Sequence, residues 1–416
     1  MVICIVGLGY VGLPLSLAFS ENNFKVIGFD SSFKRVKELN ESKDINREFS
    51  KEELSSAKNI VFTNNHSDII NANIYIITVP TPIDNDKKPN LKPLLNASEI
   101  VGKNLTVNDI VIYESTVYPG CTEEECVPVL ELNSGMTFNK DFFCGYSPER
   151  INPGDKVRRL KDIVKVTSGS NSETALKIDS LYKKIIEAGT HLAPSIKVAE
   201  ASKIIENVQR DVNISLMNEL AIIFNKIGLD TSDVLRASKT KWNFLNFKPG
   251  LVGGHCIGVD PYYLAYKAKQ VGYTPNVILS GREVNNKMGE HIAENIKNLI
   301  QNNNKEPKNC KALILGVTFK ENCSDIRNSR VFNLHESLIK FKIKVDLYDP
   351  LAINEEVFKK YKLKLIDKID KKYDIIILAV SHNEFLKMNI INFKKIDGII
   401  YDVKSVLDKN IITERL

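Results

Sequence analysis

The sequence feature that most constrains the fold is a glycine-rich turn after a short apolar run at the start of the chain. Residues 2–6 predict a strand buried on both faces, and Gly7, Gly9 and Gly12 follow it as a GxGxxG pattern. The first glycine permits a tight turn, the second lets a pyrophosphate approach the backbone, and the third lets helix and strand pack closely. Residues 13–19 predict that helix, whose N-terminus offers N–H groups to phosphate. The apolar segment is therefore interpreted as a dinucleotide-binding turn and not as a membrane span.

An acidic residue after the next strand indicates which dinucleotide binds. Residues 25–29 predict this strand, and Asp30 ends it. A carboxylate about 20 residues after the glycines binds the ribose 2′-OH of NAD and repels the 2′-phosphate of NADP. Arg35 lies nearby in the sequence and would soften that preference. The alternative is a glycine-rich turn with a surface aspartate, but strand, turn, helix, strand and acid come in the expected order, so we expect NAD.

Two further predicted strands, at residues 74–79 and 110–113, lead into Thr81 and Thr116. Because ligands of open α/β sheets sit at the carboxyl ends of the strands, we expect both threonines to contact the cofactor. Their alternative role is to cap the loops.

The C-terminal part of the chain repeats this pattern. Predicted strands at 311–315, 344–348 and 374–380 parallel the N-terminal strands that end at Gly7, Asp30 and Val79. Only Gly316 remains of the glycine pattern, so a second nucleotide, not necessarily a dinucleotide, is expected there. The predicted class is α/β, with two Rossmann-like doubly wound parallel-sheet domains joined by a long central helix and a small helical domain. The expected domains are 1–195, 196–300 and 301–416, with a polar linker at 301–309.

A helix of about 50 Å is predicted between the two halves, from Ile196 to Ile227. Pro194-Ser195 is a start signal and Gly228 a stop signal. An apolar stripe follows it, through Ile205, Val208, Val212, Leu216, Leu220, Ile223 and Ile227. We expect this helix to join the halves and to be able to form an interface between two copies. Its opposite face carries Lys203, Asn207 and Arg210, which are either functional or a solvated polar face.

One of the seven cysteines stands out. The odd number and the absence of a CxxC pair indicate a reduced chain. Cys256 lies in the glycine-rich segment 249–261, where a thiolate would be a strong nucleophile if a nearby cation or helix N-terminus lowered its pKa. Asp260 follows as a candidate base toward water. His255 is given a structural role, because adjacent side chains in an extended loop point apart. These residues are too few for a metal site.

A dinucleotide and a nucleophilic cysteine together limit the chemistry. An alcohol that loses a hydride to NAD becomes an aldehyde, which a thiolate converts to a thiohemiacetal. Loss of a second hydride gives a thioester, and water then releases an acid. Lys203 and Asn207 are suited to stabilise the developing charge on oxygen, although the sequence does not place them beside Cys256.

The chain resembles the UDP-glucose/GDP-mannose dehydrogenase family over essentially its whole length. The matching motifs are residues 7–12, 79–82, 114–120, 147–150, 203–207, 253–257, 260–261, 316–320 and 325–327. The family oxidises the 6-alcohol of a nucleotide sugar to the uronic acid with two NAD and one water. The resemblance implies that Cys256 is the nucleophile and that Lys203 and Asn207 stabilise the oxygen at C6. It implies that Asp260 and Thr116 order or activate water.

The resemblance also makes Glu149 an acid or base, the C-terminal domain the UDP-binding domain and the central helix the dimer interface. The cofactor contacts that it implies are Gly7, Gly9, Tyr10, Val11, Gly12, Asp30, Arg35, Thr81 and Thr116. The substrate contacts are Glu149, Arg150, Ile151, Lys203, Asn207, Arg210, Asn243, Phe244, Phe247, Gly250, Lys320 and Arg327.

One departure indicates a branch of the family. Members that act on UDP-glucose have a second glutamate four residues after Glu149, where this chain has Pro153. Residues 204–211 and 242–250 are similar to UDP-GlcNAc and UDP-GalNAc 6-dehydrogenases of bacterial surface polysaccharide synthesis, for lipopolysaccharide or capsule. Segment 242–250 would line the sugar pocket, although Trp242 has an alternative role in packing. The sequence does not separate the two sugars.

The composition excludes several other classes. With 57 basic and 51 acidic residues the net charge is +6, and no basic block of the kind that binds nucleic acid occurs. Apolar residues at 43% and charged residues at 26% indicate an ordinary globular chain, expected to be cytoplasmic, without membrane contact and without a metal. The remaining alternatives are a UDP-glucose 6-dehydrogenase, a two-electron dehydrogenase of the 6-phosphogluconate type and a non-catalytic nucleotide-sugar sensor.

Overall fold

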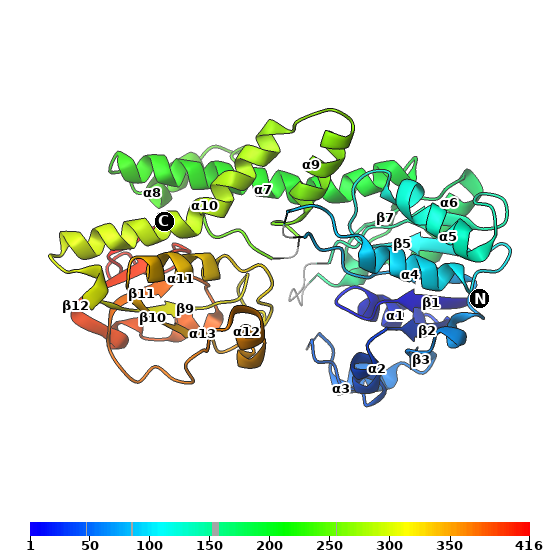
Figure 1. The fold of residues 1–416 in the computed structure, drawn as a ribbon, viewed down its shortest axis with the longest axis horizontal. Helices are drawn as coiled ribbons and strands as arrows, with labels where there is room; N and C mark the ends of the chain where they lie inside the picture. Colours follow the sequence, from blue (N-terminus) through cyan, green and yellow to red (C-terminus); the bar gives the residue numbers. More distant parts are fainter. Residues whose placement is uncertain (47, 85, 152–157, 255) are drawn as a thin grey trace. The chain divides into compact units, whose positions relative to one another are not determined.

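The computed structural model describes residues 1–46, 48–84, 86–151, 158–254 and 256–416. It confirms the predicted α/β class, with two parallel sheets and a long helix (Figure 1). The chain forms two compact units. The first unit comprises residues 1–206 and 262–273, and the second comprises residues 207–261 and 274–416.

The first unit is built on a six-stranded parallel sheet. Its strands, in spatial order, are β3 (Ile60–Thr63), β2 (Lys25–Phe29), β1 (Val2–Val6), β4 (Ile74–Ile77), β5 (Ile110–Tyr113) and β6 (Phe143–Tyr146). This order is that of a dinucleotide-binding Rossmann fold. The helices of this unit are α1 (Gly12–Glu21), α2 (Phe33–Asn40), α3 (Lys51–Ser56), α4 (Lys92–Gly102), α5 (Val127–Ser134) and α6 (Ser172–Tyr182). Two further strands, β7 (Lys165–Thr167) and β8 (Thr190–Leu192), follow β6 in the sequence and form a small parallel sheet of their own.

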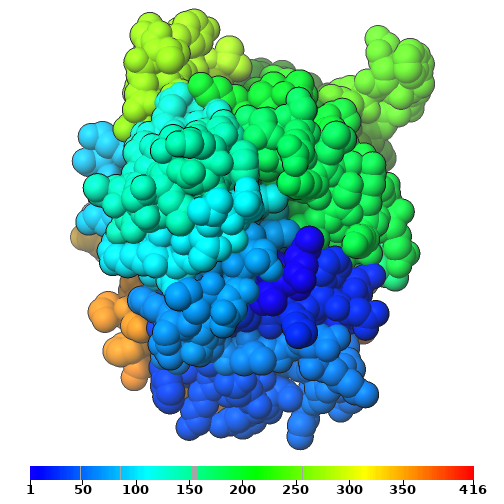
Figure 2. Space-filling view, turned by 90° about the vertical axis from the view of Figure 1, so that its right-hand side faces the viewer, coloured from blue at the N-terminus to red at the C-terminus, as the bar shows by residue number. Residues whose placement is uncertain are grey.

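The predicted strands of this sheet lie close to their expected positions. Every residue of β4 and β5 is buried, as expected for apolar strands of a parallel sheet. The one clear difference is that β4 ends at Ile77, two residues earlier than predicted. Figure 2 shows the surface of the first unit near the chain's start, in dark blue, where Met1 is largely exposed.

The second unit contains the repeated sheet. Its strands, in spatial order, are β10 (Lys344–Tyr348), β9 (Lys311–Leu315), β11 (Tyr373–Leu378), β12 (Lys394–Asp402) and β13 (Glu414–Arg415). Its helices are α8 (Thr231–Ser238), α10 (Asn276–Asn302), α11 (Val331–Lys340), α12 (Asn354–Tyr361) and α13 (Asn383–Lys387). α10 packs on α11, where a side chain at Gly289 would meet the backbone of Leu334. Because α10 ends at Asn302, it includes the first two residues of the predicted linker at 301–309.

The internal repeat extends to single hydrogen bonds. Gly7 has φ +99° and its N–H donates to the carbonyl of Phe29 at 2.8 Å. Gly316 has φ +89° and donates to the carbonyl of Tyr348 at 2.9 Å. Both glycines thus form the same left-handed turn after the first strand of their sheet, a conformation that glycine adopts at little cost.

Helix α7 (Ile196–Lys226) confirms the predicted long helix, with 31 residues. Ser195 Oγ accepts a hydrogen bond from the N–H of Val198 at 3.3 Å, so the start signal acts as an N-cap. Gly228, with φ +77°, ends it as predicted. α9 (Asp260–Gln270) follows later in the chain. Within the described ranges, no helix is both long and apolar enough to cross a membrane.

The buried face of α7 differs from the predicted apolar stripe. In the single chain Ile205, Leu216, Ile223 and Ile227 are between 45% and 62% exposed, and of the stripe only Val208 is buried. The buried residues of α7 include the apolar Ile204, Met217 and Ala221 and a polar row, which consists of Asp211, Ser215 and Asn218. The apolar stripe is therefore not what packs α7 within the chain.

Candidate active site

The glycine turn between β1 and α1 has the geometry of a phosphate cradle. A Cβ at Gly12 would overlap the carbonyl oxygen of Gly7, so only glycine lets α1 approach the turn this closely. Thr78 Oγ1 donates to that carbonyl at 2.6 Å and fixes the turn. A Cβ at Gly9 would meet nothing within 4 Å, so the space over the turn is open. These residues fit a bound NAD pyrophosphate, which the N-terminus of α1 would stabilise.

Asp30 is held against this turn. Its carboxylate accepts the N–H of Leu8 at 2.9 Å and the N–H of Ser32 at 2.8 Å. Arg35 is nearly buried and donates through Nε to the carbonyl of Leu8 at 2.8 Å, while its Nη1 pairs with Asp44 at 2.8 Å. The charge of Arg35 is thus already compensated, and the residue fixes the turn. This arrangement does not supply the cation for a 2′-phosphate that the sequence had suggested.

The two predicted threonines lie together. Thr81 Oγ1 donates to the carbonyl of Thr116 at 2.7 Å, because β4 and β5 are neighbours in the sheet. Both residues are half-buried, as are Tyr10 and Val11 at the glycine turn.

A buried cluster of charges, which the sequence alone does not predict, lies in the same unit. Lys165 Nζ contacts Glu114 Oε2 at 2.7 Å and Glu149 Oε2 at 3.1 Å, and the hydroxyl of Tyr182 donates to Glu114. Burial raises the pKa of Glu114. Burial by itself would lower the pKa of Lys165, but the two carboxylates outweigh it and the pKa is raised. The only hint in the sequence is a lysine within the apolar run of residues 163–166.

Both oxygens of Glu149 accept hydrogen bonds. In addition to Lys165, the N–H groups of Arg150 and Ile151 donate to Oε1, each at 2.6 Å. Arg150 pairs with Glu206 of α7 at 2.7 Å. The predicted substrate residues 149–151 thus form a turn around one buried carboxylate. Pro153, which stands where members that act on UDP-glucose have a second glutamate, lies outside the described residues.

Lys203, the remaining catalytic candidate of the first unit, is half-buried on α7. The nucleophile candidate Cys256 belongs to the second unit. It is half-buried, and so is Cys323, whereas the other five cysteines are buried. The carbonyl of Cys256 accepts the N–H groups of Val259 at 3.0 Å and Asp260 at 2.8 Å, which places the cysteine one turn ahead of α9. His255 lies outside the described residues.

The loop before Cys256 packs against the segment that follows β9. A Cβ at Gly253 would overlap the carbonyl oxygen of Asn328. Gly254 has φ +85° and lies on the ring of Phe319, and its carbonyl accepts Asn328 Nδ2 at 3.3 Å. Glycine is required at both positions, at Gly253 by close approach and at Gly254 also by its backbone conformation.

Two catalytic candidates meet directly. Asn207 Nδ2 donates to Asp260 Oδ2 at 2.5 Å, so the polar face of α7 and the first residue of α9 come together. Arg210, one turn further along α7, is exposed. The sequence pattern alone does not decide whether this polar face is functional or only solvated.

The predicted substrate residues after β9 are in ordered loops. Arg327 pairs with Asp325 through two guanidinium nitrogens, and Lys320 is half-buried. A fully buried histidine supports this loop, since His382 Nδ1 accepts the N–H of Asn322 at 2.9 Å. Its other nitrogen, Nε2, lies 3.2 Å from Asp349 Oδ2.

The segment at 242–250, predicted to line the sugar pocket, has neither helix nor strand. Asn243 and Trp242 are exposed, the latter by 92%, while Phe244 and Phe247 are half-buried. The large exposure of Trp242 contradicts the alternative in which it packs within this chain. Gly250, at the end of the segment, is buried.

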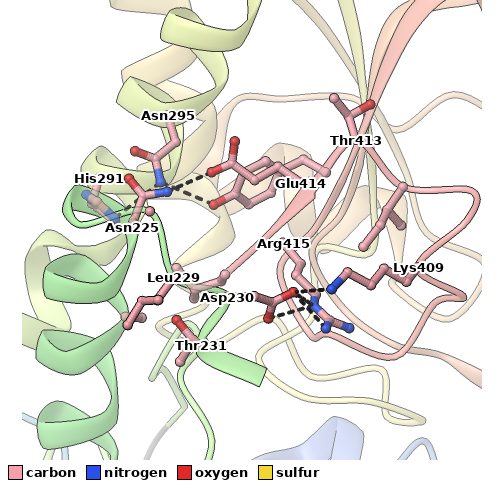
Figure 3. A pocket seen from close by; sticks show the side chains of 15 residues that line it. Asn225, Leu229, Asp230, Thr231, His291, Asn295, Lys409, Thr413, Glu414 and Arg415 are labelled. Carbon is pink, nitrogen blue, oxygen red and sulfur yellow. Dashed lines mark hydrogen bonds and ion pairs between the residues drawn. The ribbon is translucent and has the colours of Figure 1, made fainter. Parts of the chain in front are cut away.

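The second unit also has a cavity of about 320 Å³, formed by the end of α7, α10 and β13. Figure 3 shows Glu414 beside Asn225 and Asn295, and Asp230 paired with Arg415 and Lys409. Among the described residues that line it, none was predicted for catalysis or binding. The cavity is thus separate from the candidate active site.

Comparison with known proteins agrees with this geometry. The UDP-glucose/GDP-mannose dehydrogenase family matches in three segments, with its NAD binding domain over residues 1–186, its central domain over 197–287 and its UDP binding domain over 313–409. The chain is 53% identical to the UDP-N-acetyl-D-glucosamine 6-dehydrogenase of Salmonella typhi over 97% of this chain and 96% of that one. It is 51% identical to the enzyme of that name from Pseudomonas aeruginosa, over 98% and 97%. The structure of a UDP-D-ManNAc dehydrogenase from Pyrococcus horikoshii superposes with a TM-score of 0.89 at 27% identity, over 100% and 98%.

The chain therefore belongs to the UDP-glucose/GDP-mannose dehydrogenase family. Within it, the protein is an NAD-dependent UDP-sugar 6-dehydrogenase. The predictions of the family, of an enzyme and of NAD as its cofactor are confirmed.

Proposed function

We propose that the enzyme oxidises the C6 alcohol of UDP-N-acetylglucosamine to the uronic acid in two successive steps, with Cys256 as the covalent nucleophile. Support for the sugar comes from the two relatives of that name, which are more than 50% identical over nearly the full chain. Support for the covalent route comes mainly from one observation. Cys256 is a half-buried thiol on a loop whose backbone is packed at Gly253 and Gly254.

Each oxidation would use its own NAD as the hydride acceptor, and the first NADH would be exchanged for NAD before the second step. In the first, the C6 alcohol gives a hydride to NAD and its hydroxyl proton to water, which leaves an aldehyde. Lys203 and Asn207 stabilise the charge that develops on the oxygen. The Cys256 thiolate then adds to the aldehyde carbon, and the resulting oxyanion is protonated to a thiohemiacetal.

In the second oxidation the thiohemiacetal gives its remaining C6 hydride to a second NAD and its hydroxyl proton to water, which leaves a thioester. Asp260 orders and activates the water that attacks the thioester carbon, and the thiolate leaves. The hydrogen bond between Asn207 and Asp260 supports this role, since it holds the carboxylate in one orientation. Glu149 and Thr116 complete the proposed catalytic set.

The proposed substrate and cofactor contacts are those named from the resemblance. For Lys320 and Arg327 the support is their position in loops after the first strand of the repeated sheet, where nucleotides bind in such folds. The proposed setting is cytoplasmic synthesis of a bacterial surface polysaccharide.

We also propose a homodimer through α7. The support is the stripe of Ile205, Leu216, Ile223 and Ile227, which is exposed in the single chain although it is apolar. A second copy would bury the same stripe on both partners in a symmetric interface.

The nucleophile is tested by replacing Cys256 with serine. We expect C256S to form no uronic acid while it binds NAD with unchanged affinity, because the NAD contacts are in other residues. C323S, which removes the other half-buried thiol, is the matched control and should remain active. Full uronic acid formation by C256S would refute the covalent route.

A further inference from the structure

A ladder of buried polar side chains connects α7 and α10 in the second unit. It consists of Arg282, Asp211, Asn285 and Asn218, and each of these residues is at most 1% exposed. Arg282 Nη1 pairs with Asp211 Oδ1 at 2.5 Å, and Asn285 Nδ2 donates to the same oxygen at 2.8 Å. Asn218 Nδ2 donates to Asn285 Oδ1 at 2.7 Å.

The ladder ends on the backbone of Gly250. Asn218 Oδ1 accepts the N–H of Gly250 at 2.8 Å, and Asn218 Nδ2 donates to the carbonyl of Gly250 at 3.1 Å. One side-chain amide thus satisfies both backbone polar groups of a buried residue. Gly250 stands six residues before Cys256, at the start of the cysteine loop, which we define as residues 250–256.

The direction of every hydrogen bond in the ladder follows from its charged end. Arg282 is always protonated and can only donate, so Asp211 faces it as an acceptor. Asp211 then requires the amide nitrogen of Asn285, which leaves Asn285 Oδ1 to accept from Asn218. Asn218 is thereby left with its oxygen toward the N–H of Gly250. The ion pair at one end and the backbone of Gly250 at the other thus require the same orientation of the Asn218 amide, and the backbone carbonyl of Asp211 also accepts Asn285 Nδ2 at 3.1 Å.

A role in packing alone would not require this arrangement. Buried polar groups and ion pairs cost desolvation energy, and apolar residues of similar volume often stabilise a core equally well or better. What a hydrogen-bonded polar ladder adds is a single geometry for the groups that it contacts. In this unit that geometry is given to the first residue of the cysteine loop.

We propose that Asn218 is a positioning residue that fixes the start of the cysteine loop, with Asn285 and the pair of Arg282 and Asp211 holding its amide in the required orientation. This proposal rests on the proposed function for the role of Cys256. It adds a residue that contacts neither the C6 carbon nor the cofactor in the proposed mechanism.

The sharpest variant is N218D, which keeps the size of the side chain. A carboxylate retains the hydrogen bond from the N–H of Gly250 but sets an acceptor against the carbonyl of Gly250 and against Asn285 Oδ1. We expect kcat/KM for UDP-N-acetylglucosamine to fall about tenfold or more, since small misplacements of reacting groups are costly. KM for NAD should stay within about twofold, since the change disturbs the position of the cysteine loop and leaves the proposed NAD contacts in place. N218S, which is smaller and uncharged, should show the same pattern.

The second measurement reports on the loop without catalysis. The rate at which iodoacetamide alkylates Cys256, followed on its own peptide by mass spectrometry, should change in N218D and N218S. The control is S215A, which alters a buried residue one turn earlier on α7 whose Oγ donates to the carbonyl of Val212. S215A should leave the alkylation rate and both KM values near those of the unmodified enzyme.

The proposal is overturned if folded N218D and N218S keep the kcat/KM and the alkylation rate of the parent enzyme. It is also overturned if S215A, at an equal loss of melting temperature, shows the same kinetic defects, because the effect would then be general destabilisation. An active C256S would refute the covalent mechanism instead, while the alkylation rates would still report whether Asn218 positions the loop.

Discussion

At the scale of single residues, we propose that cofactor binding depends on Asp30. Its carboxylate accepts two backbone N–H groups, from Leu8 in the glycine turn and from Ser32. It therefore shapes the turn in addition to the ribose contact that we propose. The neighbouring Arg35 is paired with Asp44 and does not offer a free cation to NADP.

We expect D30A to raise KM for NAD about tenfold or more, because a ribose contact and a turn contact are lost together. The KM for the UDP-sugar should change little at saturating NAD. Steady-state kinetics with each substrate varied in turn checks this, and an unchanged KM for NAD would remove Asp30 from the ribose site.

A second residue predicts how stability depends on pH. Glu200 is fully buried, and its oxygens accept the N–H groups of Gly120 at 2.5 Å and Thr122 at 2.9 Å. Burial raises the pKa of this carboxyl from 4.5 to about 7. The folded state therefore prefers the protonated form. The contribution of Glu200 to the stability of the folded state is complete below pH 4.5 and is lost as the pH rises through about 7.

We expect the unfolding free energy of the parent enzyme, relative to E200Q, to fall by about 3 kcal/mol between pH 4.5 and pH 9. The glutamine variant does not titrate, so the difference isolates this one group. Unfolding at a series of pH values measures it, and E173Q on the exposed surface of α6 is the control. A difference that stays constant, or that grows as the pH rises, would contradict the assigned shift.

At the scale of elements, α7 shows both the strength and the limit of sequence-based prediction. Its ends at Ser195 and Gly228 were predictable because capping is local chemistry. Its buried polar row was not, because Asp211 and Asn218 are buried by partners on α10, such as Arg282, that lie far along the chain. Lys165 escaped prediction for the same reason, since its carboxylate partners come from distant segments.

The exposed stripe of α7 leads to a prediction about assembly. We expect the double variant L216E/I223E to shift the protein from a dimer to a monomer of 46.9 kDa, because two charges per copy would be buried in a symmetric apolar interface. Light scattering after size-exclusion chromatography measures the mass. I339E is the matched control, since Ile339 is a similarly exposed apolar residue on α11. A parent enzyme that is already monomeric would refute the proposed interface.

At the scale of the whole molecule, the repeated sheet was predictable because its signals are short and local. Each half of the chain has an apolar strand that ends at a glycine and a second strand that ends at an aspartate, which are Gly7 and Asp30 in the first half and Gly316 and Asp349 in the second. The N–H groups of Leu8 and Val317 donate equivalent hydrogen bonds to the two aspartates. The chemical residues were less predictable. Their types and motifs named a candidate set, but a contact such as that of Asn207 with Asp260 depends on tertiary structure.

The central claim is that one chain oxidises the same carbon twice through a covalent intermediate. The most direct test is the number of NADH molecules formed for each UDP-N-acetylglucosamine when a limiting amount of sugar is fully converted. The account predicts two NADH per sugar, with the uronic acid as the product. One NADH per sugar at complete conversion, with the aldehyde or another two-electron product, would contradict it.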